Sequence, residues 1–257
     1  LPLPANRRFD AANDELRRVI DEIIAQYRSE GLDHGDLVSM LLEARDEETG
    51  EGLSDTEIRD EVVTMYAAGF ETVSNSMGFS WHVICRNPDV EAKLYEEVDR
   101  VLGDGGPVTF EAVGKLEYTR RVFTEVLRMY TPAWFLTRRA EEDLDLDGVK
   151  VPAGTQLFFS LYALQRDEEF FPNPDVFDPD RWLPERAKEV PRWAFNPFGM
   201  GNRQCIGEPF AWAEGVVILA TMAARRRFKL ANDEPMGELA FAALRPTQLA
   251  VTVEERT

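Results

Sequence analysis

The sequence has few of the residues that build disulfide frameworks, zinc sites or nucleic-acid interfaces. Its 257 residues include two cysteines and two histidines, and 47 acidic against 29 basic side chains give a formal net charge of −18. Two cysteines give no disulfide framework, which favours a reducing cytoplasm as the compartment. A surface that binds phosphates needs a basic footprint, so the charge argues against nucleic acid as a partner. The longest apolar run, 215–224, is too short to cross a bilayer, so we expect no membrane segment in this chain.

What is present indicates a mainly helical protein with a sizeable core. Hydrophobic residues make up 44% of the chain. Ser54 and Glu57 have the spacing of a capping box at the start of a long helical pattern, about 54–86, which ends at Asn87-Pro88. Helical periodicity or apolar runs also predict helices at 14–29, 37–44, 88–101, 118–130 and from Cys205 to about Arg226.

The remaining segments predict small sheets and irregular structure. Short alternating apolar runs around an Asp147-Gly148 turn indicate a hairpin, and the tail 239–255 is typical of a second one. The proline-rich stretch 170–184 predicts an irregular meander. No shift in composition marks a boundary. We therefore expect one domain, 1–257, that is mainly α with minor antiparallel β hairpins.

One cysteine lies in an unusual loop, "FGMGNRQCIG", residues 198–207. Its glycines permit tight turns and close approach of another group. Arg203 places a permanent cation two residues before Cys205, and the helix that follows, with Pro209 in its first turn, adds a positive N-terminal end. Both features favour a thiolate over a thiol. The stretch predicts a loop that presents a sulfur anion.

Several chemistries could use such a sulfur. A lone cysteine is usually a core residue, and we interpret Cys85 in this way. The bends and the cation around Cys205 do not fit a core position. A zinc site or a Cys–His catalytic pair would need His34 or His82, and nothing favours either; we interpret His82 as a core histidine. A thiolate ligand to haem iron needs no second protein ligand. That option is the best supported.

The pattern Phe198-x-x-Gly201-x-Arg203-x-Cys205-x-Gly207 resembles the haem-binding signature of the cytochrome P450 superfamily, the haem-thiolate monooxygenases. The resemblance implies heme b (iron protoporphyrin IX), with Cys205 as the axial ligand of the iron. It also implies that the glycines let backbone N–H groups reach the sulfur and that Arg203 pairs with a propionate. The cofactor-binding residues implied in this loop are Phe198, Gly199, Arg203, Cys205 and Gly207.

A second stretch, "AAGFET" at 67–72, interrupts the long helical pattern with polar residues. A glycine inside a helix costs about 1 kcal/mol relative to alanine. From the residues alone, the alternative is a kinked core helix whose threonine bonds to its own backbone. The resemblance implies that the helix opens at Ala68 and Gly69 to form an oxygen pocket. It further implies two catalytic residues, Thr72, which stabilises the bound oxygen by a hydrogen bond, and Glu71, which relays protons.

Two further stretches resemble structural motifs of the family. Glu125 and Arg128 share one helix face at a spacing of three residues, so we expect an ion pair. The meander "FPNPDVFDPDRW", 171–182, supplies a second arginine, Arg181, that brackets the glutamate. Trp182 stands where phenylalanine is frequent in the family. The resemblance implies that these residues hold the cysteine loop in shape and take no part in catalysis.

The segment after the helix at 118–130 resembles the family's first strand on the substrate side. Arg138 matches the arginine that binds the other propionate, with Arg139 as the competing choice. Trp134, Phe135 and Leu136 would line the substrate side, unless they are ordinary core residues. Residues 238–241 of the last hairpin are a further candidate for this side.

The function implied is hydroxylation of a small apolar organic molecule, in some relatives a terpenoid, with O2 and two electrons. The cysteine thiolate favours O–O cleavage. The expected electron donors are a ferredoxin and its reductase, docking on a face behind Cys205 that is made basic by Arg192, Arg203 and residues 225–227. The alternatives are a haem-thiolate isomerase or dehydratase, against which the Glu71–Thr72 pair argues, and a non-catalytic or remnant haem-binding fragment.

The resemblance covers nearly the whole chain but only the C-terminal portion of the family fold, so the N-terminal part is expected to be absent. The opening residues resemble the family's segment just after the lid over the substrate. An apolar face of the long helix would then lack its cover. We expect residues 1–257 alone to bind haem poorly and to aggregate, because large exposed apolar patches are sticky.

Overall fold

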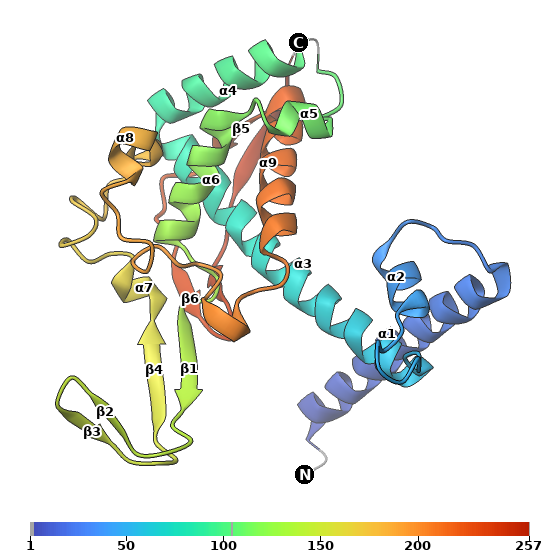
Figure 1. The fold of residues 1–257 in the computed structure, drawn as a ribbon. Helices are drawn as coiled ribbons and strands as arrows, with labels where there is room; N and C mark the ends of the chain where they lie inside the picture. The colour runs from blue at the N-terminus through green and yellow to red at the C-terminus, as the bar shows by residue number, and fades with distance from the viewer. Residues whose placement is uncertain (1–2, 104, 257) are drawn as a thin grey trace. The chain divides into compact units, whose positions relative to one another are not determined.

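The structure is a computed structural model that describes residues 3–103 and 105–256. The chain divides into two compact units, Leu1–Phe70 and Glu71–Thr257, which are described separately. The helices, labelled in Figure 1, are α1 (Pro4–Glu30), α2 (Leu37–Glu43), α3 (Asp55–Arg86), α4 (Pro88–Leu102), α5 (Phe110–Val113), α6 (Glu117–Met129), α7 (Leu161–Leu164), α8 (Pro184–Ala187) and α9 (Glu208–Arg225), with 3-10 turns η1 (Pro179–Trp182) and η2 (Gly201–Arg203). The strands are β1 (Phe135–Arg139), β2 (Leu144–Leu146), β3 (Val149–Val151), β4 (Gln156–Ser160), β5 (Arg226–Leu230), β6 (Glu238–Ala240), β7 (Leu244–Pro246) and β8 (Val251–Glu255).

The first unit consists of α1, α2 and the beginning of α3. Helix α1 starts at Pro4, earlier than the predicted residue 14, because a proline is well suited to the first turn of a helix. It ends at Glu30, close to the predicted residue 29, and is capped by Gly31, whose φ of 60° is the left-handed conformation that glycine adopts without strain. The predicted capping box is confirmed: the Ser54 N–H donates to Oε2 of Glu57 at 2.8 Å, and the Glu57 N–H donates to Oγ of Ser54 at 3.3 Å.

The second unit has a helical core in which α4, α6 and α9 lie side by side (Figure 1). Helix α6 has no capping side chain of its own at Leu116. Instead the buried carboxylate of Glu97, on α4, accepts from the backbone N–H groups of Tyr118 and Thr119, each at 2.7 Å. These are donors that a helix start leaves unpaired, so α4 supplies the cap of α6.

Helices α6 and α9 approach each other closely at one glycine. A Cβ atom on Gly215 would lie 2.3 Å from Cε1 of Phe123, far inside van der Waals contact. The Phe123 ring is 1% exposed and belongs to the main core cluster. Only a residue without a side chain leaves room for this ring, which explains the glycine in the middle of an apolar helix.

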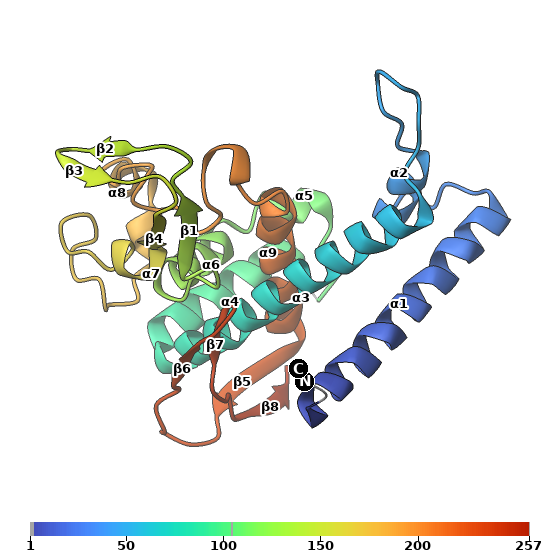
Figure 2. The ribbon, with the colours of Figure 1, turned by 90° about the horizontal axis from the view of Figure 1, so that it is seen from below.

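The sheets are small and antiparallel, as predicted. β1 pairs with β4, with Leu136 opposite Phe159, and β2 pairs with β3. Asp147 and Gly148, with φ of 50° and 87°, form the predicted turn of the β2–β3 hairpin. In Figure 2 this hairpin and the β5–β8 pair lie at opposite ends of the second unit.

The tail differs from the single hairpin predicted over 239–255. β6 pairs with β7, whereas β8 pairs with β5, the segment directly after α9. A strand pairs with whichever edge completes its hydrogen bonds, and alternation alone cannot identify that partner. The overall expectation of a mainly α protein with minor antiparallel hairpins is confirmed.

Of two residues in the second unit that we interpreted as core residues, His82 is buried and Cys85 is half-buried. Cys85 packs against the main core, its Sγ lies 3.4 Å from the carbonyl oxygen of Phe228, and burial raises the pKa of its thiol to about 11. His82 is 8% exposed, and burial followed by the charge of Arg86 lowers the pKa of its imidazole. Neither side chain therefore offers a reactive or charged group at neutral pH.

Candidate functional site

The loop that carries Cys205 closes on itself through its backbone. The Cys205 N–H donates to the carbonyl oxygen of Phe198 at 2.9 Å, and the Gln204 N–H donates to that of Gly201 at 3.0 Å. Gly199 and Gly201 have φ of 73° and 71°, so both turns of the loop depend on glycine. The loop ends in α9, which begins at Glu208.

The sulfur of this loop is accessible and close to a helix start. Cys205 is exposed. A Cβ atom on Gly207 would lie 3.8 Å from its Sγ, so the backbone runs beside the sulfur at this point. Cys205 lies three residues before the start of α9, and the N-terminal end of a helix favours negative charge. The arrangement can present a thiolate to a ligand above the loop.

Strand β1 lies directly against the cysteine loop. A Cβ atom on Gly199 would lie 3.6 Å from Cδ1 of Leu136, which places Leu136 on the face of β1 that contacts the loop. Side chains alternate along a strand, so Arg138 shares that face and Arg139 does not. Consistent with this, Nη2 of Arg139 lies near Gly154, where a Cβ atom would be 3.7 Å away. The alternation therefore places Arg138, and not Arg139, on the face of β1 that contacts the cysteine loop.

The cations around the loop are exposed. Arg203 lies in η2 and Arg138 in β1, and both residues are exposed. One Nη atom of Arg138 donates to the carbonyl oxygen of Thr137 at 2.8 Å. Guanidinium groups in such positions can pair with carboxylates of a ligand.

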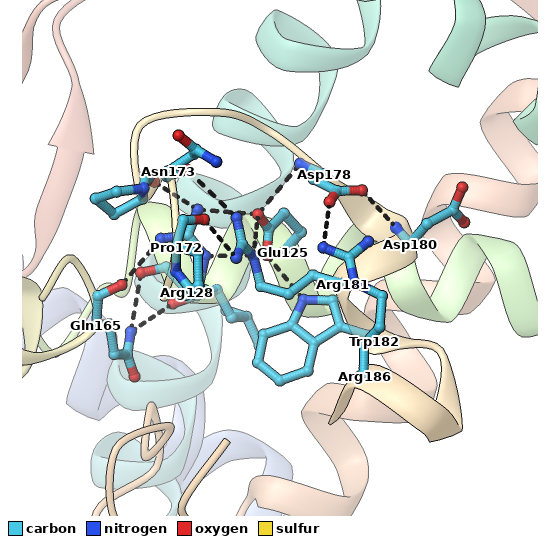
Figure 3. A network of polar contacts seen from close by, with 12 residues as sticks. Glu125, Arg128, Gln165, Pro172, Asn173, Asp178, Asp180, Arg181, Trp182 and Arg186 are labelled. Atoms are coloured by element: carbon cyan, nitrogen blue, oxygen red, sulfur yellow. Dashed lines mark hydrogen bonds and ion pairs between the residues drawn. The ribbon is translucent and has the colours of Figure 1, made fainter. Parts of the chain in front are cut away.

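Glu125 is the centre of a polar network whose central pair is fully buried (Figure 3). Glu125 and Arg128 are both 0% exposed, and two parallel hydrogen bonds join them, from Nε to Oε2 at 3.0 Å and from Nη2 to Oε1 at 2.9 Å. Nη2 of Arg128 also donates to the carbonyl oxygen of Pro174 at 2.7 Å. A buried charge is tolerated only when it is paired and hydrogen-bonded in this way.

The meander supplies the other partners of Glu125. Nε of Arg181 lies 3.3 Å from Oε1 of Glu125, and its Nη1 donates to the carbonyl oxygen of Pro172 at 3.0 Å. The indole N–H of Trp182 donates to Oε2 of Glu125 at 2.8 Å (Figure 3). The phenylalanine that is frequent at this position in the family could not donate a hydrogen bond. The tryptophan of this chain therefore adds one hydrogen bond to the network.

Sequence reasoning missed Gln165, which ties this network to the cysteine loop. Its side chain is fully buried, and Nε2 donates to the carbonyl oxygens of Leu127 and Arg128, each at 3.0 Å. Its Oε1 accepts the backbone N–H of Asn196 at 3.1 Å, two residues before Phe198. A lone polar residue after a short apolar run carries no local signature that would have identified this role.

Helix α3 carries the remaining predicted residues. Its backbone is helical without interruption from Ala68 to Thr72, so the local opening that the resemblance implies stays a prediction. Ala68 and Gly69 are exposed, and Glu71 and Thr72 are half-buried. The division of the chain into two units falls between residues 70 and 71.

The predicted substrate-side residues lie at the start of β1. Trp134, Phe135 and Leu136 are half-buried, and the indole N–H of Trp134 donates to the carbonyl oxygen of Phe241 at 2.9 Å. Phe241 follows β6 and is 69% exposed. The structure therefore places the two candidate segments, 134–136 and 238–241, next to each other.

The arginines predicted to form one basic face do not lie together. Arg203 lies near the start of α9, whereas Arg225 ends that helix, and the 18 residues of α9 span roughly 27 Å. Arg226 pairs with Glu255 at 2.8 Å, and Arg227 lies 3.6 Å from Glu91. The prediction of a single face is wrong for residues 225–227, because helix length separates them from the loop and neighbouring carboxylates neutralise two of them. Arg192 is exposed in the segment before the loop.

These residues fit a cofactor that brings its own metal. In the described parts of the chain, 3–103 and 105–256, no three His, Cys, Asp or Glu side chains are grouped closely enough to hold a metal ion. Haem requires one protein ligand, apolar contacts for the porphyrin and cations for its propionates. Cys205, the ring of Phe198 and the guanidinium groups of Arg138 and Arg203 are residues of these kinds, on adjacent segments.

Comparisons with known proteins agree with this geometry. The family model for cytochrome P450 matches residues 1–251. Cyclooctat-9-en-7-ol 5-monooxygenase of Streptomyces melanosporofaciens is 47% identical over 229 residues, which cover 89% of this chain and 50% of that protein. Pentalenene oxygenase of Streptomyces avermitilis is 43% identical over 258 residues, covering 100% of this chain and 57% of that protein.

Solved structures with a similar fold include haem domains. The crystal structure of the cytochrome P450DA heme domain matches with a TM-score of 0.89 and 33% identity, over 94% of this chain and 54% of that one. The chain thus spans about half the length of the curated relatives and solved structures it matches. By the family match, the relatives and the fold, the chain belongs to the cytochrome P450 family, whose cofactor is haem.

Proposed function

We propose that the whole protein is a haem-thiolate monooxygenase that hydroxylates an apolar terpenoid with O2 and two electrons. When bound, haem supplies the activation of O2 for transfer of one oxygen atom to a C–H bond. The observation that carries the proposal is the exposed Cys205 in a loop shaped by two left-handed glycines. The names of two relatives refer to cyclooctat-9-en-7-ol and to pentalenene, which supports an unsaturated, largely apolar ring system as substrate.

In this proposal the loop and β1 hold the cofactor. Cys205 ligates the iron, Phe198 packs beside the porphyrin, and Arg203 and Arg138 each pair with a propionate. The alternation along β1, which places Arg138 on the face of Leu136, supports Arg138 over Arg139. Gly199 and Gly207 keep the backbone close to the sulfur so that its N–H groups can stabilise the thiolate.

Helix α3 delivers protons in this proposal. The Glu71 carboxylate takes up protons from water and passes them on, and Oγ1 of Thr72 donates a hydrogen bond toward the site of oxygen binding. Ala68 and Gly69 present backbone without bulk, which leaves room for a small ligand. Both polar side chains are half-buried, which suits groups that exchange protons with solvent and act at a partly dry site.

The substrate and the electron donor approach from different elements. Trp134, Phe135 and Leu136 line the substrate side together with residues 238–241, because the Trp134–Phe241 hydrogen bond joins these segments. A ferredoxin, reduced by its reductase, docks near the exposed Arg203 and Arg192, since a basic patch on an acidic protein attracts an acidic partner.

In the part of the chain that the structure describes, no helix is long and apolar enough to cross a membrane. The chain has two cysteines, which favours the cytoplasm as the compartment.

The absorption spectrum of the reduced carbon monoxide complex tests the ligand. A strongly red-shifted Soret band of the haem-loaded protein is the expected result, because thiolate ligation produces it. Absence of the band in a protein that contains haem would overturn the assignment of Cys205 and leave a haem-binding protein of another kind.

A threonine pair on α3 tests the proton pathway. Thr72→Ala should leave electron consumption in place but lower the product formed per electron pair, because protons then reach the site without control. Thr64→Ala is the matched control, since Thr64 lies on the same helix, is exposed and bonds to the carbonyl oxygen of Asp60. Equal coupling in both variants would refute the role of Thr72.

A further inference from the structure

We propose that Trp212, on α9, is a positioning residue that fixes the cysteine loop to helix α6. It acts on both sides of Cys205, through its ring on Phe198 and through its indole N–H on Glu208, which in turn holds Gln204. The inference rests on the proposed function, because it assumes that Cys205 is the ligand of the iron.

The first connection is a contact between rings. The ring centroids of Trp212 and Phe198 lie 5.4 Å apart at an angle of 60°. The carbonyl oxygen of Phe198 accepts the N–H of Cys205 at 2.9 Å. A shift of the Phe198 backbone would therefore move the backbone of Cys205, and the Trp212 ring restrains that shift.

The second connection is a chain of hydrogen bonds at a spacing of four residues. Nε1 of Trp212 donates to Oε1 of Glu208 at 3.2 Å, and Nε2 of Gln204 donates to Oε2 of the same carboxylate at 2.6 Å. Gln204 directly precedes Cys205 in the sequence. The two oxygens of Glu208 thus join the indole to the residue before the ligand, and Glu208 and Trp212, four residues apart on α9, share one helix face.

Trp212 can restrain the loop because α6 holds it from the other side. The ring of Phe123 meets it edge to face, with centroids 5.7 Å apart at 89°, and the guanidinium carbon of Arg120 lies 5.3 Å from the Trp212 ring centroid. Phe123 is itself fixed in the space that Gly215 leaves open. Edge-to-face and cation–π contacts orient a ring as well as burying it.

A simple packing role is the competing explanation, since an aromatic residue on an apolar helix is usually a core residue. Trp81 provides the comparison within this protein. It is 3% exposed and packs on Phe228 with centroids 4.1 Å apart, but its buried indole N–H has no partner in the described chain. Trp212 differs because both of its connections end next to Cys205.

The experiment uses the haem-loaded protein with the same substitutions at the two tryptophans. Trp212→Leu removes the ring and the N–H, Trp212→Phe removes only the N–H, and Trp81→Leu and Trp81→Phe are the matched controls. Three quantities are measured: the thermal midpoint, the rate of haem transfer to apomyoglobin, and the fraction of the reduced carbon monoxide complex with the red-shifted Soret band.

We expect Trp212→Leu to release haem about tenfold faster, the size of effect seen when residues that orient a metal ligand are lost. Part of its carbon monoxide complex should lose the red-shifted band. Trp212→Phe should show a smaller effect in the same direction, and Glu208→Ala added to it should change little more, because both break the same connection. The Trp81 variants should lower the thermal midpoint without changing haem release or the spectrum.

Two results would overturn the proposal, and they are distinguishable. If haem release follows the thermal midpoint alone in all variants, Trp212 is a packing residue and the assignment of Cys205 stands. If the unsubstituted protein holds haem without the red-shifted band, the proposed function fails, and the role of Trp212 fails with it.

Discussion

The Glu125 network and the Cys205 loop, both in the second unit, contrast in how their polar groups are satisfied. Glu125, Arg128 and Gln165 are fully buried, and their hydrogen-bonding atoms face partners from the same chain. The Cys205 loop is exposed from Gly201 to Ile206, and backbone hydrogen bonds and glycine conformations shape it.

The difference separates residues whose partners lie within the chain from the residues that we propose to bind the cofactor. A buried ion pair with every partner present contributes a fixed geometry, and its loss leaves an uncompensated charge in the core. An exposed sulfur and exposed guanidinium groups gain little from the chain itself. Substitutions in the network should therefore change the free energy of unfolding. Substitutions in the loop should instead change the binding or the spectrum of the cofactor.

The largest expected effect on stability is removal of one charge from the network. Arg128→Leu should lower the free energy of unfolding by about 3–5 kcal/mol, because Glu125 then loses its bidentate partner while it stays buried. Urea unfolding followed by circular dichroism measures the change. Arg128→Lys, which keeps the charge but not the fork of two donors, provides a milder variant if the leucine variant does not fold.

An exposed pair at the same spacing is the control for this prediction. Glu15 and Arg18, on α1, are also three residues apart, with side chains 63% and 53% exposed. Arg18→Leu should change the unfolding midpoint little, since water replaces the lost partner. Equal losses at Arg18 and Arg128 would contradict the distinction between the two regions.

Trp182→Phe should lower the free energy of unfolding by less than Arg128→Leu does. The substitution keeps an aromatic ring beside Phe195 but removes the donor to Oε2 of Glu125, so the free energy of unfolding should fall by roughly 1–3 kcal/mol. The same unfolding experiment measures it. Combined with Arg128→Leu, the loss should be less than the sum of the two single losses, because both act on one carboxylate. Strict additivity would show that the indole N–H does not take part in the network.

A pH-dependent effect is expected from His82 in the core of the second unit. Its folded pKa lies below the ordinary value of 6.5, from burial first and from Arg86 second. The unfolded chain therefore takes up the proton first as the pH falls below 6.5, so the free energy of unfolding should decrease there and recover above it. Glu234 lines the same small cavity as His82 and is the acidic side chain on that cavity.

The substitution His82→Gln isolates this contribution. Unfolding midpoints of the two proteins are compared at about pH 7.5 and about pH 5, on either side of the histidine's range. We expect a shallower decrease for the variant. A parallel decrease in both proteins would assign the pH dependence to carboxylates alone.

The smallest effect on stability, and the largest on the cofactor, should come from Cys205→Ser. Because Cys205 is exposed, the free energy of unfolding should change by no more than about 0.5 kcal/mol. The red-shifted band of the reduced carbon monoxide complex should disappear completely, since a serine oxygen does not replace the thiolate. Cys85→Ser is the reverse control, because it places a hydroxyl in the core and should affect stability without affecting the band.

The sequence was sufficient to predict most of the helices and the shape of the cysteine loop. Helix boundaries follow local rules, and Ser54, Gly31 and Asn87-Pro88 carry them in a few residues each. Glycine at positions 199 and 201 indicates left-handed turns without any knowledge of the rest of the chain. The assignment of haem came from the resemblance to the cytochrome P450 signature, because local rules alone do not identify what an exposed cysteine sulfur binds.

The contacts that the sequence could not predict join distant segments. Gln165 and Asn196 are 31 residues apart, Glu125 and Trp182 are 57 apart, and β8 pairs with β5 across the intervening β6–β7 hairpin. Gln165 and Asn196 have no signature in their own neighbourhoods, and the motifs that contain Glu125 and Trp182 do not indicate the hydrogen bond between these two residues. Each contact depends on the tertiary fold, which brings one donor to one acceptor.

The buried amide of Gln165 has a consequence for how the protein ages. Its nitrogen faces two carbonyl oxygens of α6, and its oxygen faces the N–H of Asn196, so each end has a partner of the opposite kind. Hydrolysis of that amide to a carboxylate would release its nitrogen as ammonia, put an oxygen in its place and direct a negative charge at two carbonyl oxygens. A change of one mass unit at residue 165 would then loosen the sulfur-bearing loop from helix α6 while leaving the cysteine itself intact.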